Sequence, residues 1–271
     1  MTEIRDNFEL SECHSHVFRP FQQSPLSSRR ILAPAKSPRE EIEEVWRTSE
    51  LDHAVLIEAS ALVDDHAAPL ATPPGSPTNR RGVVHLVLGD FYAILAVPHQ
   101  RGRGAVRCNW IVSLLASNGD SGRHRFAHAT ALPRRIGALG CHLYFQTDIV
   151  DQDLVTRLDA HHKTPVVIDY MDSPPQALAD DSFWVEASGA DRLTEEASNV
   201  VQVVQSVRSL LDAATSRRFL GLDWAPVNSA IKRCAVSLAD LMIQLAGNGK
   251  TLERVLFCKP AQLYSLGLEV A

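Results

Sequence analysis

Cysteines are few in this sequence, and none of them forms a CxxC pair. The 271 residues include five, at positions 13, 108, 141, 234 and 258. An odd number of scattered cysteines does not make a disulfide framework, so the small secreted scaffolds that depend on disulfides are excluded. We expect free thiols.

Long apolar runs and a secretion signal are also missing. No stretch approaches the roughly 20 apolar residues that a membrane-spanning helix needs. The opening residues, MTEIRDNFEL, carry acidic side chains where a signal peptide has its basic and apolar regions. The sequence therefore predicts a cytoplasmic protein with no membrane partner.

The chain has no excess of positive charge. Its formal net charge is -5, so a nucleic-acid partner is not expected. Hydrophobic residues make up 45% and charged residues 22%, close to the globular average, so a substantial core can form. Barrels of alternating strands and helices reach this length as one domain. We expect a single domain over residues 1–271 and leave open whether it forms a homo-oligomer.

Short β-rich runs that end in polar residues alternate with helix-like segments. Several of these runs are almost continuously apolar, as strands covered on both faces should be. This pattern predicts an α/β fold of the (β/α)8 TIM barrel type. The expected strands are residues 8–14, 53–60, 83–90, 105–110, 142–148, 165–171, 183–188 and 218–224.

Helix signals occur between these strands. The sequence Ser37-Pro38-Arg39-Glu40 is a capping box with proline at the first helical position, and an apolar stripe follows it. A second, longer apolar stripe predicts a helix over about 193–214. Residues 65–81 are rich in proline and small polar residues, which indicates a loop. The segment LFCKPAQLYSL near the C-terminus is expected to close the floor of the barrel.

In a barrel of this kind the active site lies at the C-terminal ends of the strands. His14 and His16 share a parity on the first strand, so both can point into the mouth of the barrel. The strand-end candidates are His14, His16, Ser60, Asp90, Arg107, Asn109, Tyr144, Gln146, Asp169, Tyr170 and Asp223.

Several stretches resemble one family in their order and spacing. They are ECHSHVF, HAVLIEAS, AVRCNWIVSLL, LYFQTDIVDQDL, VVIDYM, SGADRL, GLDW and KPAQLYSL. Together they are similar to the amidohydrolase superfamily, in the branch that contains 2-pyrone-4,6-dicarboxylate lactonase, over residues 8–267. The resemblance implies a distorted (β/α)8 barrel. It also implies hydrolysis or isomerisation of small anionic lactones, commonly without a metal.

The resemblance assigns roles to individual residues. His14 and His16 match the HxH motif, and Asp223 matches the aspartate that acts as general base on water. Arg107 and Arg192 match arginines that hold a substrate carboxylate. Tyr144 and Ser60 match positions that contact the substrate, and Tyr170 stands where the family usually has histidine.

The departures from the family bear on metal and substrate. A hydrolytic zinc site needs about three protein ligands. Tyr170 and Pro226 replace the imidazoles that would add to His14, His16 and Asp223, so a binuclear site is excluded. We expect a metal-free site, with one zinc or other divalent ion at those three residues as the alternative. Serines at 113 and 173 replace basic residues, which predicts a substrate with fewer charges than a dicarboxylate.

The leading hypothesis is a hydrolase that opens a lactone or ester-like ring of a small carboxylated metabolite. Asp223 would deprotonate water, and His14 and His16 would polarise the carbonyl. A metal-dependent decarboxylase, a lactone isomerase and a catalytically degenerate binding barrel remain alternatives. The residues themselves also allow plainer roles. The histidine pair could tie down the first loop, Asp223 could cap a helix, and Arg107 could pair with Asp90.

Overall fold

The computed structural model describes a set of segments spread along the whole chain. These are residues 9–17, 39–48, 51–58, 80–85, 108–111, 142–146, 165–169, 184–189, 204–205, 207–209, 211, 217–224, 243–244 and 246–266. They include a strand from each of the eight expected strand regions. The sequence therefore predicted a strand in each of these regions, with bounds that differ by a few residues.

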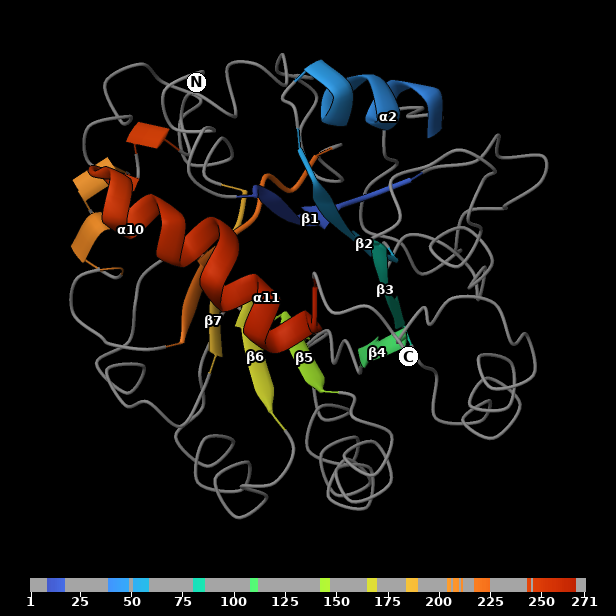
Figure 1. The fold of residues 1–271 in the computed structure, drawn as a ribbon. Helices are drawn as coiled ribbons and strands as arrows, with labels where there is room; N and C mark the ends of the chain where they lie inside the picture. Colours follow the sequence, from blue (N-terminus) through green and yellow to red (C-terminus); the bar gives the residue numbers. More distant parts are fainter. Residues whose placement is uncertain are drawn as a thin grey trace.

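The strands form two parallel sheets in chain order (Figure 1). The first contains β1 (Ser11–Ser15), β2 (His53–Ile57), β3 (Arg80–His85) and β4 (Cys108–Ile111). The second contains β5 (Leu143–Gln146), β6 (Val166–Asp169), β7 (Trp184–Ala187) and β8 (Arg218–Leu220).

The end of the second sheet returns to the first strand. Ser15 forms a parallel bridge with Trp224, and the backbone N–H of His16 donates to the Trp224 carbonyl over 2.7 Å. Strands β4 and β5 are neighbours, although their described residues form no ladder. Eight parallel strands in chain order, with the last returning to the first, are the arrangement of a TIM barrel.

The predicted loop over residues 65–81 is wrong at its end, because strand β3 begins at Arg80. The sequence suggested a loop there because the segment is rich in proline and small polar residues. In the structure Arg81 is buried, and its guanidinium donates to the carbonyls of Tyr264 over 2.8 Å and Ser265 over 2.5 Å. A buried arginine is tolerated when such acceptors replace water.

Helices cover the strands where the apolar stripes predicted them. Helix α2 (Arg39–Thr48) buries Ile42 and Trp46, and its capping-box residues 37 and 38 lie outside the described residues. Residues 204–205, 207–209 and 211 of the predicted 193–214 helix are helical. Helices α10 (Gly249–Glu253), η4 (Arg254–Cys258) and α11 (Lys259–Tyr264) follow one another without a break.

Helix α11 closes the floor of the barrel, as the sequence predicted. Tyr264 lies edge-on to Phe219 of β8 and to His142, the residue before β5, with ring centroids 5.9 and 5.2 Å apart. His142 directly precedes β5, and Phe219 is the second residue of β8. The opposite, C-terminal ends are thereby left for a functional site.

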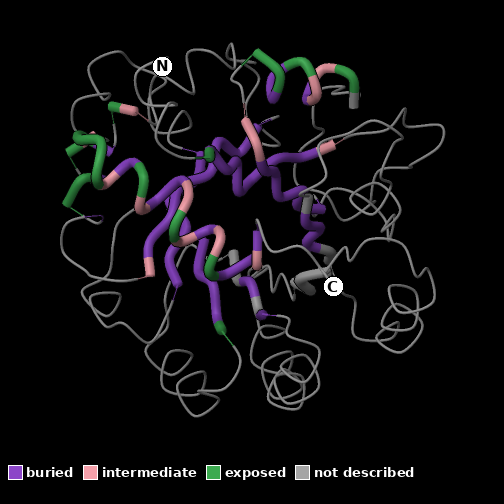
Figure 2. The backbone as a smooth tube through the Cα atoms, viewed as in Figure 1, coloured by how far each residue is buried: buried purple, intermediate pink, exposed green. Residues whose placement is uncertain are grey.

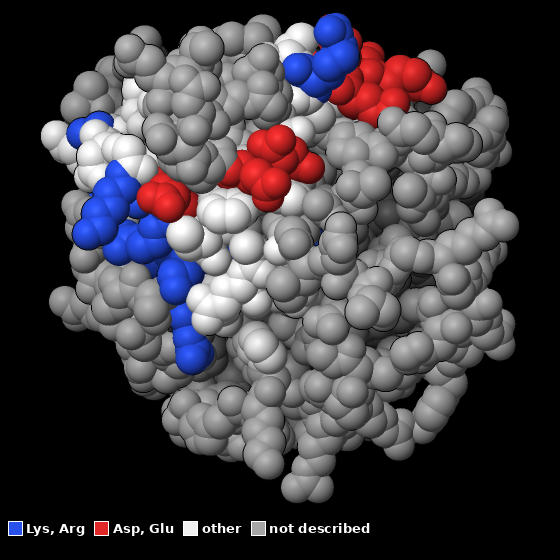
Figure 3. All heavy atoms as spheres, in the orientation of Figure 1, with Lys and Arg blue, Asp and Glu red and all other residues white. Residues whose placement is uncertain are grey.

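Burial and charge divide the structure into an apolar interior and a charged exterior. The strand residues whose burial is described are buried, whereas α2 and α10 expose one side (Figure 2). On the face drawn in Figure 3, charged side chains of the described residues gather over α2 and along the C-terminal helices. Cys13 and Cys258 are free thiols, as expected. Among the described residues, no helix combines the length and apolar character that crossing a membrane requires.

Candidate active site

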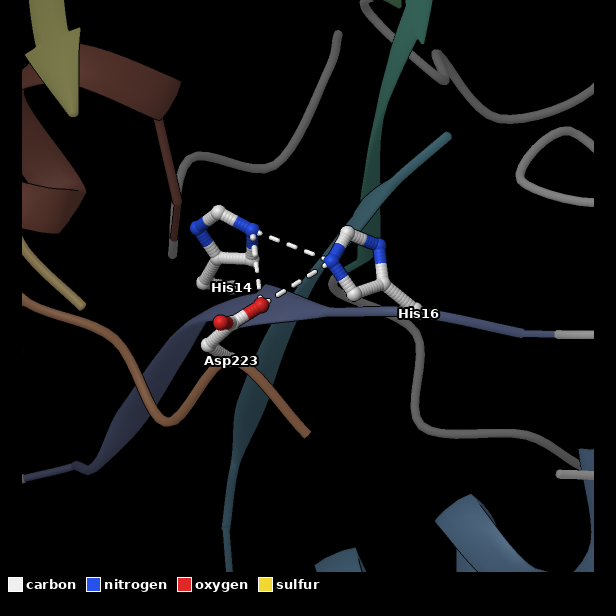
Figure 4. A group of neighbouring side chains, drawn as sticks. All are labelled: His14, His16 and Asp223. Carbon is white, nitrogen blue, oxygen red and sulfur yellow. Dashed lines mark hydrogen bonds and ion pairs between the residues drawn. The ribbon is translucent and has the colours of Figure 1, made fainter. Parts of the chain in front are cut away.

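Two histidines from the start of the chain meet an aspartate from near its end (Figure 4). His14 lies on β1, His16 follows that strand directly, and Asp223 lies beyond the end of β8. The Nε2 atoms of the two histidines are 3.2 Å apart. Asp223 Oδ1 lies 3.0 Å from His16 Nε2 and 3.4 Å from His14 Nε2. The sequence predicted this convergence correctly.

The backbone after β8 is shaped for this approach. A Cβ atom on Gly221 would lie 2.5 Å from both Glu186 Oε1 and His14 Cβ, so only glycine lets the segment come this close. Asp223 has a φ of 54°. Residues other than glycine rarely take this left-handed conformation, and such strain gathers at functional sites. Both features place the Asp223 carboxylate against the histidines.

The proton on His16 can be assigned from its partners. Its Nδ1 lies 2.8 Å from the carbonyl oxygen of Ile57. A carbonyl can only accept a hydrogen bond, so Nδ1 carries the proton. In the neutral ring, Nε2 then has no proton, and its lone pair points at Asp223 and His14.

The outer nitrogen of His14 is held by Tyr144. The Tyr144 hydroxyl lies 3.0 Å from His14 Nδ1 and donates to Glu186 Oε2 over 2.6 Å. Burial raises the pKa of Tyr144 well above its usual value, which keeps this hydroxyl protonated. Since a phenol has one proton, and ionised Glu186 accepts it, His14 donates through Nδ1 to the Tyr144 oxygen while Glu186 is ionised.

Three acceptor atoms therefore face one another. His14 Nε2, His16 Nε2 and Asp223 Oδ1 form a triangle with sides of 3.0, 3.2 and 3.4 Å. Ligands of a tetrahedral zinc ion lie about 3.3–3.6 Å from one another, from metal–ligand distances of about 2.0–2.2 Å. Outward N–H groups on both rings are also typical of metal-bound histidines. The donor types suit one divalent ion, and the two shorter sides would lengthen by about 0.1–0.3 Å to hold tetrahedral zinc.

A second group that combines His14 with Asp169 and Glu186 does not fit a metal as well. Asp169 Oδ2 and Glu186 Oε1 lie 3.9 and 3.5 Å from His14 Nδ1. That nitrogen is the one that donates to Tyr144, so it has no lone pair to offer. The two carboxylates instead stabilise positive charge on the ring.

A proton on His14, like a metal ion, can supply positive charge between the three acceptor atoms. Burial lowers the pKa of His14, but Glu186, Asp223 and Asp169 outweigh it and raise the pKa to about 10. Burial raises the pKa of Glu186 to about 7. Without another cation nearby, His14 is thus an imidazolium at neutral pH.

Glu12 fixes the histidine strand to the segment that carries Asp223. Its Oε1 accepts hydrogen bonds from the backbone N–H groups of His14 over 2.7 Å and Leu222 over 3.1 Å. The Ser15 hydroxyl donates to the same oxygen over 3.2 Å. Burial raises the pKa of this carboxyl to about 7. Glu12 thereby sets the spacing between β1 and Asp223.

The structure describes half of the expected site. His14, His16, Asp223 and Tyr144 are brought together, and Asp169 lies beside them. Ser60, Arg107, Arg192 and Tyr170 lie outside the described residues, as do positions 90, 113, 173 and 226. Sequence reasoning missed Glu12 and Glu186. The signal that could have found them is a carboxylate within an otherwise apolar strand, in SECHS and WVEA.

Comparisons with known proteins show what the chain as a whole is similar to. No family model matches the chain. The chain is 25% identical over 276 residues to the 4-sulfomuconolactone hydrolase of Hydrogenophaga intermedia, covering 93% of this chain and 88% of that protein. The predicted resemblance to the amidohydrolase superfamily is confirmed.

Solved structures share the barrel fold of this chain. A candidate 2-pyrone-4,6-dicarboxylic acid hydrolase from Pseudomonas putida is 24% identical, with a TM-score of 0.74 over 96% of this chain and 99% of that one. An amidohydrolase from Burkholderia multivorans with bound zinc is 17% identical, with a TM-score of 0.61 over 96% of this chain and 100% of that one. These likenesses show the fold.

Proposed function

We propose that this protein is a hydrolase that opens the lactone or ester-like ring of a small carboxylated metabolite. The observation that carries the proposal is the buried triangle of His14 Nε2, His16 Nε2 and Asp223 Oδ1, with no side longer than 3.4 Å. The likeness to a lactone hydrolase over 93% of the chain supports the same reaction class.

Asp223 acts as the general base. Its carboxylate takes a proton from water while the water oxygen attacks the ring carbonyl, and the ring C–O bond then breaks. The proton passes from Asp223 to the departing oxygen, which leaves a hydroxy acid. General-base catalysis contributes typically about 10²–10⁴-fold in rate.

His14 stabilises the negative charge that develops on the carbonyl oxygen. The sequence expected the same of His16, but its proton lies on Nδ1, and Nε2 of the neutral ring can only accept. As an imidazolium, His14 can donate through Nε2 toward that oxygen, because its other nitrogen is already engaged by Tyr144. A positioned donor of this kind is worth about 2.7–4 kcal/mol. This arrangement needs no metal.

A metal-dependent version uses the same residues. His14 Nε2, His16 Nε2 and Asp223 Oδ1 would hold one divalent ion, as the donor set allows. Such an ion supplies Lewis-acid polarisation of the carbonyl. This fit also favours a metal-dependent decarboxylase as the second candidate function.

The substrate's carboxylate is held by Arg107 and Arg192, with Ser60 and Tyr170 as further contacts in this proposal. The role of Tyr144 differs from the substrate contact that the sequence predicted. Its hydroxyl already serves His14 and Glu186, so it acts on the substrate through His14. We also propose one distorted (β/α)8 domain over residues 1–271, since β1 and α11, from opposite ends of the chain, share a core.

A substrate screen with an Asp223→Asn variant tests the proposal. Lactones with one or two carboxylates are followed by ring opening, and carbon dioxide release is measured beside it to detect decarboxylation. The variant should retain substrate binding and lose about 10²–10⁴-fold in turnover. An unchanged rate would remove Asp223 from the mechanism.

Two measurements complete this experiment. Asp52→Asn is the matched control, because Asp52 accepts from the Leu10 backbone over 2.9 Å at the floor end of the barrel and an amide oxygen can do the same. Its turnover should stay at the wild-type level. The metal content of the purified protein then separates the two versions, and about one equivalent of zinc would favour the metal-dependent one.

A further inference from the structure

Glu186 is the least expected member of the site. It lies on β7, has no exposed surface, and is not one of the three residues assigned to the reaction. A carboxylate in such a position costs free energy unless it has partners. Its contacts therefore indicate what it does.

The contacts of Glu186 all lead to His14. Its Oε2 accepts the Tyr144 proton over 2.6 Å, and its Oε1 lies 3.5 Å from His14 Nδ1. The Tyr144 oxygen then lies 3.0 Å from the same His14 nitrogen. Gly221 leaves the space for this carboxylate, since a Cβ there would lie 2.5 Å from Oε1.

The direction of this hydrogen-bond chain decides which nitrogen of a neutral His14 ring carries the proton. Tyr144 has one proton. While that proton points at Glu186, His14 must donate through Nδ1, and Nε2 stays turned toward His16 and Asp223. If the acceptor were removed, the Tyr144 proton could turn to Nδ1, and Nε2 would carry the ring proton of neutral His14.

We propose that Glu186 is a positioning residue that orients His14, with Nδ1 as its outward donor and Nε2 toward His16 and Asp223, by accepting the proton of Tyr144. The inference deepens the proposed hydrolase function and rests on it for the kinetic part only. It holds for both versions of the mechanism, since each needs His14 Nδ1 as the outward donor. Partners of this kind typically change activity or metal affinity about 10–100-fold.

The test compares Glu186→Leu with Glu186→Gln by nitrogen NMR of the histidine rings, with His14 assigned from its loss in His14→Asn. In the wild type, Nδ1 of His14 should carry a proton. In the metal-free protein, at a pH at which the ring is neutral, Glu186→Leu should leave Nδ1 bare and move the proton to Nε2. Glu186→Gln should restore the wild-type pattern, because an amide oxygen still accepts from Tyr144.

Kinetics and a control variant add a second readout. On a lactone that the wild type turns over, Glu186→Leu should lower kcat about 10–100-fold with KM unchanged, and Glu186→Gln should recover most of it. Tyr264→Phe is the control. It removes an equally buried hydroxyl that has no hydrogen-bond partner among the described residues, and it should change neither readout.

Each outcome decides the inference. A neutral His14 ring that keeps its proton on Nδ1 in folded, metal-free Glu186→Leu, or a wild-type ring with bare Nδ1, overturns it. If Glu186→Leu does not fold, the wild-type and Glu186→Gln spectra decide, and a bare Nδ1 in either one overturns the inference. The NMR readout uses no substrate. A protein that opens no lactone but shows the expected spectra would refute the hydrolase function and leave the positioning role intact.

Discussion

Gly221 should be the most sensitive position in the segment that carries Asp223. An alanine Cβ there would lie 2.5 Å from Glu186 Oε1, 2.5 Å from His14 Cβ and 3.2 Å from His14 N. Glu186 could turn its carboxylate away only by leaving Tyr144, and His14 Cβ is fixed by its strand. The segment must therefore move away from β1.

The size of the effect follows from overpacking. An inserted methyl group in a close-packed site costs typically about 1–3 kcal/mol. For a protein of this size each kcal/mol lowers Tm by roughly 2–4 °C, so Gly221→Ala should lose about 2–12 °C. A shift of about 1 Å between catalytic groups can cost about 10²-fold in rate, so turnover should fall much more than stability.

Thermal unfolding and steady-state kinetics on Gly221→Ala check this prediction, with Gly249→Ala as the matched control. Gly249 is the first residue of α10, and a Cβ there meets nothing within 4 Å. The control should be neutral or gain up to about 1 kcal/mol, because alanine favours the helix. If Gly221→Ala melts and turns over like the wild type, the close approach of this segment to His14 is refuted.

Two further predictions concern stability. The pKa of Glu12 is raised from 4.5 to about 7 and that of His14 from 6.5 to about 10, so the folded state binds protons more tightly than the unfolded chain. The free energy of unfolding should thus fall as pH rises from about 4.5 to 10, and Glu12→Gln should flatten the part below pH 7 in urea titrations. An equal slope in both proteins would contradict this. Asn248→Ala, which removes the side-chain acceptor of the Thr251 N–H at 2.9 Å, should cost about 1 kcal/mol by the same assay, and Asn248→Asp should not.

The sequence could predict the strands and the triangle of His14, His16 and Asp223 because both depend on local pattern. Apolar runs mark β1 to β8, and polar residues at their ends mark the mouth of the barrel. The start of β3 was missed because Arg81 is stabilised by carbonyls of α11, about 180 residues away along the chain. No local pattern contains that partner.

Glu12 and Glu186 were missed for a related reason. A carboxylate inside an apolar strand looks unfavourable until its donors are known, and those donors come from the backbone of Leu222 and the side chain of Tyr144. These donors come from residues that are distant in the sequence but adjacent in the barrel. Sequence spacing alone gives the histidines and Asp223 but not the groups that orient them.

The charge around the site limits how an anionic substrate can bind. Glu12, Asp169, Glu186 and Asp223 are all buried near two histidines. If all four were ionised and the histidines neutral, the local charge would be strongly negative and would repel a carboxylate. The raised pKa values of Glu12 and Glu186, about 7 each, remove part of this charge, and a proton or divalent ion at the triangle offsets more. The reacting carbonyl can then approach the triangle while the substrate's own carboxylate is held farther out, which is the role proposed for Arg107 and Arg192.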